Sequence, residues 1–573
     1  MRFYFWLAAA TLALVLPFCG AVHLFDWDEI NFAEAAREML VRGNYIQPTI
    51  NFLPFWEKPP LFFWMQAAAM HLFGVGEFAA RFPNAALCSV ATVCTLAWLG
   101  KRLQGPGLQL WWPLVYLGSV LPQFYLRSGL IDPWWNLLIF WSLLGLFFHT
   151  QARQRGEGGW AAIAFGGLAA GLAVLTKGPV ALLLIGLTAF FYWALVHRFR
   201  IHFAWAGLLL FAGLAVLVPG LWVGAYARQY DATLLEQFTA YQTRLAQTED
   251  AGHGGFPGYH VVVLLFGCFP ASFLFIRALT ARKPGQLLGP AAGPTLTHHQ
   301  DLHAFWPLMQ ILFWVVLVVF SIVKSKIVHY SSLCYPPLTF GAALAVQAIV
   351  EQRLRVPGYA KAGWILVGSI LGLACLAFPL LAHYAEVVKP LLAEDPFAQA
   401  NLDALADMHF TGLEPAVGLW AIGVPCMAIA LLNRARLLQA MWTLFGGTAL
   451  TVMLVLWAYI GRAEALSQGA AIAWQQGLQG KQGYVLPLGY RSYAPMFYAQ
   501  LRPEQAPNAA YAQSFTFIPD RWADSLLTQP SDRPVYVISK VTEQQTWQRY
   551  PLLQETGRRN GFVFLKKAAD IGR

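Results

Sequence analysis

The chain has 573 residues, of which 57% are hydrophobic and only 12% are charged, and its mean hydropathy is +0.49. A soluble protein of this length needs far more charge to cover its surface, so the composition excludes that class. The net charge is +10, but no basic stripe with interleaved aromatic residues accompanies it, which argues against nucleic acid as a partner.

Apolar runs of about 20 residues, long enough to cross a bilayer, recur from the N-terminus to about residue 460. The first has no convincing cleavage site after it and is expected to remain as a membrane helix. The predicted spans are 4–22, 83–100, 108–125, 133–149, 160–176, 179–196, 203–225, 259–278, 304–323, 331–349, 363–383, 414–432 and 439–459. The expected fold class is an α-helical polytopic membrane protein with about thirteen transmembrane helices.

Paired basic residues mark six short loops between these spans. They are Lys101 and Arg102, Arg153 and Arg155, Arg198 and Arg200, Arg282 and Lys283, Arg353 and Arg355, and Arg434 and Arg436. Cytoplasmic loops carry such an excess of Lys and Arg, so the N-terminus is predicted to be cytoplasmic. The longer loops and the C-terminal segment then lie on the outer face.

The first outer loop, 23–82, is too long for a simple connector. Ile30, Ala33 and Leu40 give its first part the pattern of an amphipathic helix, expected to lie along the membrane surface. The apolar stretch 61–73 is too short to cross and suits a second interfacial helix.

The sequence becomes mixed and more polar after residue 460. Short β-rich runs are predicted at Gly483–Leu486, Val535–Ser539 and Phe562–Leu565. We therefore divide the chain into a membrane domain, 1–460, and a small outer α/β domain, 461–573.

Three acids open the predicted helix of the first outer loop. Asp26 as N-cap with Glu29 three residues later has capping-box spacing, which leaves Asp28 without a structural task. An acid at the membrane surface can act as a general base, and Asp28 is the candidate.

Cations recur at the outer ends of the spans. Lys58, in a Glu57-Lys58-Pro59-Pro60 run, is either part of an ordinary surface ion pair or placed for a lipid phosphate. The other polar residues at these ends are Arg127, Asp132, Lys177, Lys324, Lys326 and His329. Snorkelling explains any one of the cations, but together they indicate an anion site.

The run GHGGFPGYH holds His253 and His260 and is either a gate, a metal-binding loop or a plain glycine-rich turn. A divalent metal, with His253 and His260 as candidate ligands, is the one candidate cofactor. None of the seven cysteines has CxxC spacing, so neither a zinc site nor a disulfide framework is expected.

These parts fit displacement at a sugar's anomeric carbon with a lipid phosphate as leaving group. A carboxylate would take the proton of the attacking hydroxyl, and cations would stabilise the departing phosphate.

The segments DWDEINFAEAAREML, FWEKPPL, TKGP and SKSKIVHY, with Asp132, occur in order at the ends of spans. They resemble the bacterial branch of the protein O-mannosyltransferase superfamily, above all its lipid A 4-amino-4-deoxy-L-arabinose transferases. The resemblance covers the membrane portion and implies a GT-C fold in a bacterial inner membrane, with a periplasmic C-terminal domain. It also implies a polyprenyl-phosphate sugar donor and inversion at the anomeric carbon.

The resemblance carries roles onto matching positions. Asp28 matches the catalytic aspartate, and Lys58 matches a lysine near the donor phosphate. Combining residues and resemblance, the candidate donor-phosphate ligands are Lys58, Lys326 and Arg127, and the candidate substrate-binding residues are Glu29, Glu57, Asp132, Lys177, His329 and Tyr330.

One departure concerns specificity. Aminoarabinose transferases typically have Arg-Tyr two residues after their Asp-Glu, and here Asn31-Phe32 stands instead. The acceptor therefore stays open among lipid A, another glycolipid, a glycan and a protein.

Two other classes compete with a transferase. A transporter or flippase for a lipid-linked sugar would use the cations as a substrate path, but such proteins usually show repeats and polar groups near the bilayer midplane. A structural membrane partner would leave Asp28 and Lys58 without a task.

Overall fold

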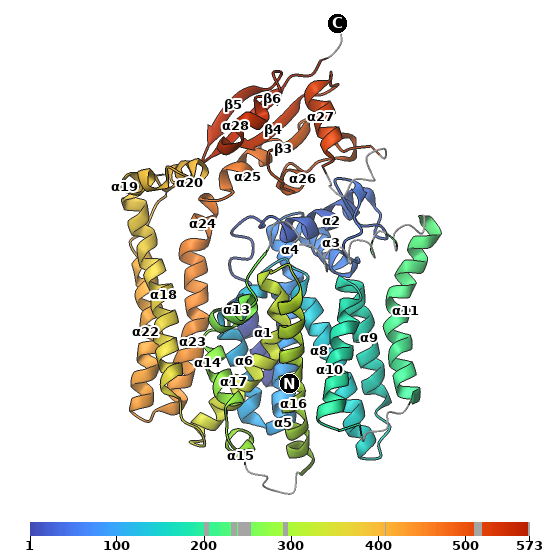
Figure 1. Cartoon of the computed structure of the whole chain (residues 1–573), viewed down its shortest axis with the longest axis vertical. Coiled ribbons are helices and arrows are strands. Elements are labelled where there is room, and N and C mark those ends of the chain that lie inside the picture. Colours follow the sequence, from blue (N-terminus) through green and yellow to red (C-terminus); the bar gives the residue numbers. More distant parts are fainter. Residues whose placement is uncertain are drawn as a thin grey trace.

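The computed structural model describes residues 1–199, 205–230, 254–289, 296–406, 408–508 and 518–570, together with Glu236 and Phe238. Long helices stand side by side in one bundle, and the first outer loop and the C-terminal domain cover the same end of it (Figure 1). The loop lies directly on the bundle, and the C-terminal sheet lies beyond the loop.

The bundle is built from two sets of helices. Those of the N-terminal half are α1 (Arg2–Val15), α5 (Ser89–Gln104), α6 (Pro106–Leu117), α7 (Val120–Tyr125), α8 (Asp132–Gln154), α9 (Trp160–Lys177), α10 (Val180–Leu195) and α11 (Trp205–Gln229). Those of the C-terminal half are α13 (Tyr259–Gly267), α14 (Ala271–Leu279), α15 (Pro284–Leu288), α16 (Leu296–Ile322), α17 (Tyr335–Val350), α18 (Gly358–His383), α22 (Glu414–Asn433) and α23 (Leu437–Val455). Helices α18, α22 and α23 stand together at one side and α11 at the other (Figure 1).

Within the described residues, eight helical segments are long and apolar enough to cross a membrane, or nine if α13 and α14 form one bent span. This confirms a polytopic helical membrane protein. Each of the thirteen predicted spans contains helix, but α1 and α10 have only 14 and 16 residues. The count of thirteen crossings therefore stays a prediction.

Two spans predicted as continuous, 108–125 and 259–278, are broken instead. The first breaks between α6 and α7, and the second turns by 113° between α13 and α14. The breaks meet, because the Val120 N–H donates to the Phe269 carbonyl at 3.1 Å. Hydropathy records composition only, so it could not reveal backbone groups that are satisfied between two distant segments.

Small residues set how closely the helices pack. A Cβ atom on Gly145 of α8 would lie 2.5 Å from the Cα atom of Gly166 of α9. A Cβ atom on Gly372 of α18 would lie 2.6 Å from the carbonyl oxygen of Gly418 of α22. Such close backbone approach is how helices associate in lipid, where burial of apolar surface gives little driving force.

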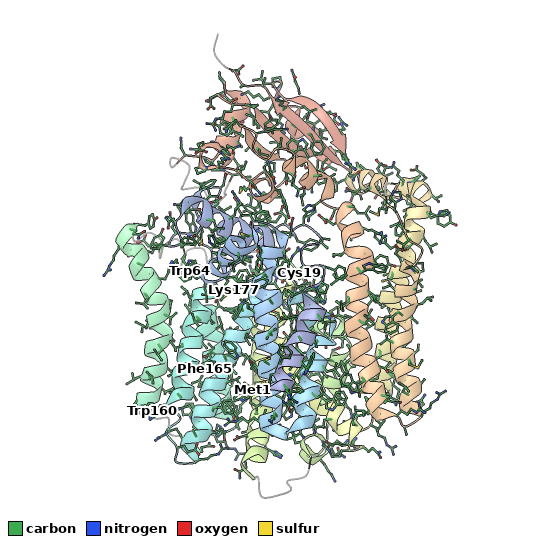
Figure 2. The ribbon with its side chains drawn as sticks, turned by 180° about the vertical axis from the view of Figure 1, so that it is seen from behind. Met1, Cys19, Trp64, Trp160, Phe165 and Lys177 are labelled. Carbon is green, nitrogen blue, oxygen red and sulfur yellow. The ribbon has the colours of Figure 1, made fainter. Side chains whose placement is uncertain are left out.

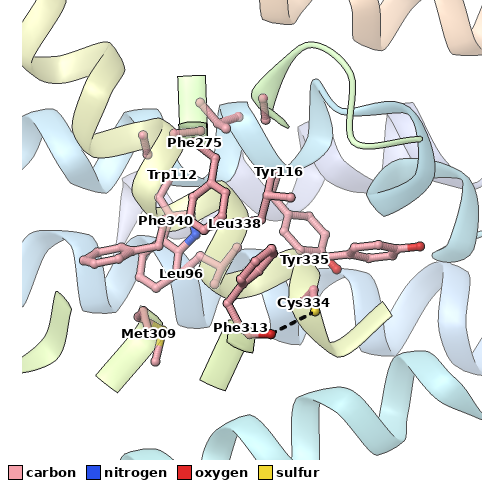
Figure 3. Packing of buried hydrophobic residues seen from close by; sticks show 14 of the residues in the cluster. Leu96, Trp112, Tyr116, Phe275, Met309, Phe313, Cys334, Tyr335, Leu338 and Phe340 are labelled. Atoms are coloured by element: carbon pink, nitrogen blue, oxygen red, sulfur yellow. Dashed lines mark hydrogen bonds between the residues drawn. The ribbon is translucent and has the colours of Figure 1, made fainter. Parts of the chain in front are cut away.

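Aromatic side chains fill the centre of the bundle (Figure 3). The rings of Trp112 and Phe340 have centroids 4.6 Å apart, and the Trp112 indole N–H donates to the Thr339 hydroxyl at 3.2 Å. The polar tip of the buried Trp112 side chain thus finds a partner while its ring body packs.

The first outer loop contains α2 (Asp28–Arg42), β1 (Thr49–Ile50), β2 (Leu53–Pro54), α3 (Leu61–Phe73) and α4 (Glu77–Phe82), and a π-helical turn, η1 (Pro83–Cys88), joins α4 to α5. Both predicted interfacial helices form. However, α2 is buried from Glu29 to Met39, including the charged Glu34, Arg37 and Glu38. Its polar face does not lie at an open membrane surface as expected, because the C-terminal domain covers it: Arg37 donates to the Leu501 carbonyl at 3.0 Å.

The C-terminal domain is a four-stranded mixed sheet with short helices. Its elements are α24 (Gly461–Ala465), α25 (Gly469–Gln476), β3 (Tyr484–Leu488), α26 (Ala494–Tyr498), α27 (Asp520–Thr528), β4 (Val535–Lys540), α28 (Gln544–Trp547), β5 (Gln554–Arg559) and β6 (Phe562–Lys567). The strand order is β3-β4-β6-β5, with β3 and β4 parallel and the other pairs antiparallel. The three predicted strands are confirmed, and β5 was missed because this exposed edge strand has no alternating apolar pattern.

Short elements complete the connections. They are η2 (Val328–Cys334), α19 (Ala385–Val388), η3 (Lys389–Leu392), α20 (Pro396–Asn401), α21 (Asp403–Ala406), η4 (Leu456–Ile460), η5 (Pro503–Gln505) and η7 (Val541–Glu543). The helix that includes α23 continues through η4 and α24 to Ala465, so the boundary placed at 460 falls inside a helical segment.

Candidate active site

The predicted base, Asp28, is the first residue of α2, with its side chain 35% exposed. The expected capping box is wrong: the N-cap is Trp27, and no side chain caps the helix. Asp26 instead accepts the backbone N–H of Tyr493 in the C-terminal domain at 3.2 Å. A carboxylate in the first turn of a helix interacts favourably with the helix dipole.

Glu29 points away from Asp28 into a buried ion pair. Its carboxylate accepts from Arg81 Nε and Nη2, both at 2.8 Å, and from the Gly129 N–H at 2.6 Å. Burial disfavours the ionised form, but the Arg81 guanidinium and these hydrogen bonds outweigh it and hold the pKa of Glu29 below its usual range. Glu29, a candidate substrate-binding residue, is thus occupied in holding α2 to α4 and to the turn before α8.

Residues from three distant segments meet at Asp28. His329 Nε2 in η2 lies 3.5 Å from Asp28 Oδ2 and 3.8 Å from Asp132 Oδ2, while Lys177 Nζ donates to Asp132 Oδ1 at 2.6 Å. One imidazole nitrogen therefore faces two carboxylates, and one of these is paired with an ammonium group.

Helix ends place these side chains. Asp132 is the first residue of α8 and Lys177 the last residue of α9, so each charge matches the sign that the helix dipole favours there. Helix α9 stops at Gly178, whose φ of 97° suits glycine. Lys177 lies at the end of the bundle nearest α2 and α3 (Figure 2).

Lys58 is the second cation at this place. Lys58 Nζ lies 4.0 Å from Glu57 Oε2, and the Lys58 side chain is 14% exposed. Its charge acts on both Asp132 and His329. The hairpin before it is fixed because Glu38 Oε2 accepts from the Thr49 hydroxyl at 2.6 Å and from the Phe52 N–H at 2.9 Å. We name Asp28, Lys58, Asp132, Lys177 and His329 the acid–cation cluster.

Aromatic rings border the cluster. Lys177 Nζ lies 5.1 Å from the ring centroid of Trp135 and 5.2 Å from that of Tyr330, at cation–π distance. The Tyr125 ring centroid lies 6.4 Å from that of His329. Sequence reasoning named Tyr330 and missed the other two. Trp135 could have been found from its position one helical turn after Asp132.

Two predicted phosphate ligands have other partners. Lys326 Nζ donates to the Phe320 and Ser321 carbonyls at 3.2 and 2.7 Å and to the Val323 carbonyl, so its ammonium group caps the end of α16. Arg127 donates to the backbone carbonyls of Leu14 and Gln123. In the part of the chain that the structure describes, neither cation contacts the acid–cation cluster.

The predicted metal-binding loop provides no set of metal ligands among the residues that the structure describes. His260, on α13, packs between the rings of Tyr259 and Phe320. His253 lies outside the described residues. Among the described residues, no group of three or more His, Cys, Asp or Glu side chains could hold a metal ion.

Comparison with known proteins extends this description. Residues 57–222 match the family model for dolichyl-phosphate-mannose-protein mannosyltransferases. The chain is 28% identical over 432 residues to an undecaprenyl phosphate-alpha-4-amino-4-deoxy-L-arabinose arabinosyl transferase of Edwardsiella ictaluri, an alignment covering 73% of the chain and 71% of that protein. It is 31% identical over 375 residues to the protein of the same name in Pseudomonas aeruginosa, covering 65% and 63%. The chain thus spans less than two thirds of the second relative.

The fold has a solved counterpart over its full length. The crystal structure of ArnT from Cupriavidus metallidurans bound to undecaprenyl phosphate aligns with a TM-score of 0.72 and 20% identity, covering 100% of this chain and 99% of that one. The apo structure of the same protein aligns with the same TM-score and 18% identity. Residues 57–222 thus match this family, and the chain as a whole is ArnT-like in sequence and in fold.

Proposed function

We propose that this protein transfers a sugar from a polyprenyl-phosphate donor to an acceptor hydroxyl at the outer face of a bacterial inner membrane. The observation that carries the proposal is the acid–cation cluster at one end of the bundle, in which His329 links Asp28 to Asp132 and Asp132 is paired with Lys177. The charge of Lys58 also acts on Asp132. A donor that never leaves the bilayer can reach this place from the side, and an acceptor can reach it from outside.

Each charge has a task in this reaction. Asp28 accepts the proton of the acceptor hydroxyl as its oxygen attacks the anomeric carbon. The bond from that carbon to the phosphate oxygen breaks, and the electron pair leaves with the polyprenyl phosphate. Lys58 lies where it can stabilise the growing negative charge on the phosphate. Attack opposite the leaving group inverts the anomeric configuration, and the leaving phosphate needs no general acid.

Two buried residues distinguish this chain from the aminoarabinose transferases, so neither the sugar nor the acceptor is assigned by that resemblance. Asn31 and Phe32 stand where aminoarabinose transferases typically have arginine and tyrosine, and both are buried. The Phe32 ring packs against Phe62 and Phe63 at centroid distances of 6.2 and 5.8 Å. We propose a hexose or pentose as the donor sugar, and lipid A, another glycolipid, a glycan or a protein as the acceptor.

A flippase is the weaker alternative. Asp132 and Lys177 lie at the ends of their helices, whereas a transport site is expected near the bilayer midplane.

The test uses purified protein in proteoliposomes with a panel of polyprenyl-phosphate-linked pentoses and hexoses, and with nucleotide sugars as controls. We expect release of polyprenyl phosphate, detected by mass spectrometry, from at least one lipid-linked donor and from no nucleotide sugar. Consumption of a nucleotide sugar, or movement of an intact lipid-linked sugar across the bilayer without cleavage, would contradict the proposal.

A further inference from the structure

A large groove opens between α5, α8 and α9 at the end of the bundle away from the C-terminal domain. Its volume is about 660 Å³, within the range of ligand-binding pockets. Figure 2 shows Trp160 and Phe165 at this end and Lys177 at the other. Because α9 runs from Trp160 to Lys177, about 18 Å of helix separates Phe165, at the near end of the groove, from Lys177 of the acid–cation cluster. The transfer reaction does not use it.

The walls of the groove are mostly apolar and aromatic. The aromatic residues that line it are Trp98, Trp141, Phe148, Trp160 and Phe165. Trp98, Trp160 and Phe165 are 43%, 46% and 47% exposed, so their rings face whatever surrounds the protein. Trp160 begins α9, at the depth where tryptophan is enriched in membrane proteins, and Phe165 lies about 7.5 Å deeper along the helix. The groove therefore runs from the headgroup level into the acyl-chain region.

An arginine stands at the shallow end of the groove. The Arg102 guanidinium carbon lies 4.3 Å from the ring centroid of Phe148 and 5.6 Å from that of Trp98, so the two rings hold the cation in place. No carboxylate within the described ranges pairs with Arg102, and its buried Nε has no hydrogen-bond partner there. Lys101 and Arg153, both exposed, add positive charge at the same end of the bundle.

We propose that the groove binds one anionic phospholipid of the inner leaflet, with its phosphate beside Arg102 and an acyl chain along Trp160 and Phe165. The apolar walls match the chain, and the uncompensated cation matches the phosphate. A zwitterionic headgroup brings its own cation toward Arg102, Lys101 and Arg153, which disfavours it. The leaflet follows from the orientation predicted by the loop charges.

The test is native mass spectrometry of the intact protein after exchange into equal amounts of phosphatidylglycerol and phosphatidylethanolamine. We expect one retained phosphatidylglycerol per chain. Arg102→Ala should lower this occupancy about fivefold, the factor for one charge at the membrane surface. Arg434→Ala, which removes an exposed cation from the turn between α22 and α23 and does not line the groove, should retain the full occupancy.

A second variant separates loss of binding from loss of folding. Ala161 lines the groove and is exposed, so Ala161→Trp fills the groove while keeping Arg102. It should also lose the retained lipid, with thermal stability measured to show that the fold persists. Equal retention of both lipids by the natural chain, or full phosphatidylglycerol occupancy in either Arg102→Ala or Ala161→Trp, would overturn the proposal.

Discussion

His329 occupies an unusual position between two carboxylates. Its Nε2 atom lies 3.5 Å from Asp28 and 3.8 Å from Asp132, so it contacts the proposed base and a second acid at once. Asp132 is already paired with Lys177 at 2.6 Å. We therefore regard His329 as a positioning residue that fixes the Asp28 carboxylate toward the incoming hydroxyl.

The variant His329→Gln tests this role. It removes the ring that faces both acids, and we expect kcat to fall about 10- to 100-fold because the base loses its orientation. The KM for the lipid-linked donor should stay nearly unchanged, since the Lys58 and Lys177 cations remain. Steady-state kinetics with varied donor concentration gives both constants.

The control for this variant is His71→Gln, on the exposed end of α3. It should leave both constants unaltered. An unchanged kcat in His329→Gln, or a change confined to KM, would show that His329 does not position the base.

Several site residues were predictable one at a time, because charge at a membrane-facing helix end is conspicuous. Asp28, Lys58, Asp132, Lys177 and His329 were all named, and the structure brings them together. Lys326 and Arg127 were named on the same ground, yet their partners are backbone carbonyls. A sequence displays the charge of a side chain but not the acceptors around it, so it could not separate the two groups.

At the scale of elements, the first outer loop depends on one buried ion pair. Glu29 of α2 and Arg81 of α4 are both 4% exposed and are joined by two hydrogen bonds of 2.8 Å. Arg81 also donates to the Cys19 and Val22 carbonyls at 2.9 and 2.8 Å. This pair thus fixes the start of α2, and with it the neighbouring Asp28, against the segment that follows α1.

Breaking this pair should be costly. Glu29→Ala leaves the Arg81 charge buried without its partner, and we expect a loss of about 3 kcal/mol in the free energy of unfolding. Thermal unfolding followed by tryptophan fluorescence measures the change.

The matched control is Glu555→Ala, which breaks the exposed pair with Arg558 on the edge strand β5. It should cost well under about 1 kcal/mol, as surface pairs do. Equal destabilisation by the two variants would contradict a special role for the Glu29–Arg81 pair.

The acids at the start of α2 show what a local sequence pattern could not predict. The spacing of Asp26 and Glu29 predicted a helix that begins with a capping box. The helix forms, but the capping box does not. Asp26 bonds to Tyr493, 467 positions away, and Glu29 bonds to Arg81 and Gly129. Local pattern can propose a cap, but a tertiary partner that binds the same carboxylate more favourably decides the outcome.

At the scale of the whole molecule, the C-terminal domain is tied to the segment between the first membrane helix and α2. The backbone N–H of His23 donates to Glu464 at 3.3 Å, and the His23 ring is paired with the same carboxylate. The Leu24 N–H donates to the Tyr498 hydroxyl at 2.6 Å. Partial burial lowers the pKa of His23, but the Glu464 carboxylate outweighs it, so the pKa lies above its usual value of 6.5.

This pair predicts a pH dependence of stability. A folded pKa above the unfolded value means that the His23–Glu464 pair stabilises the fold fully below pH 6.5. The contribution, about 1 kcal/mol for a partly exposed pair, is lost as the pH rises through the folded pKa. His23→Gln should therefore be less stable than the natural chain at pH 6, with the difference shrinking by pH 9. Thermal unfolding across this range measures it, and a difference independent of pH would contradict the assignment.

Composition and motif order were sufficient to predict the architecture. They did not predict the contacts between remote segments. Hydropathy located the apolar segments, and β-rich runs located three of the four C-terminal strands. These patterns did not reveal that a backbone hydrogen bond between Val120 and Phe269 joins the two broken spans. They also did not reveal that α2 is covered rather than exposed. Both features depend on which distant backbone groups meet, which one sequence does not display.

The most direct test of the central claim compares Asp28→Asn with Asp26→Asn in proteoliposomes supplied with the lipid-linked donor that the natural chain consumes. Both variants remove one carboxylate from the same short stretch, but only Asp28 faces the acid–cation cluster. We predict that Asp28→Asn lowers the rate of transfer by about 10²- to 10⁴-fold with its fold intact, and that Asp26→Asn stays within about tenfold of the natural rate. A folded Asp28→Asn protein that transfers sugar at the natural rate would show that Asp28 is not the base.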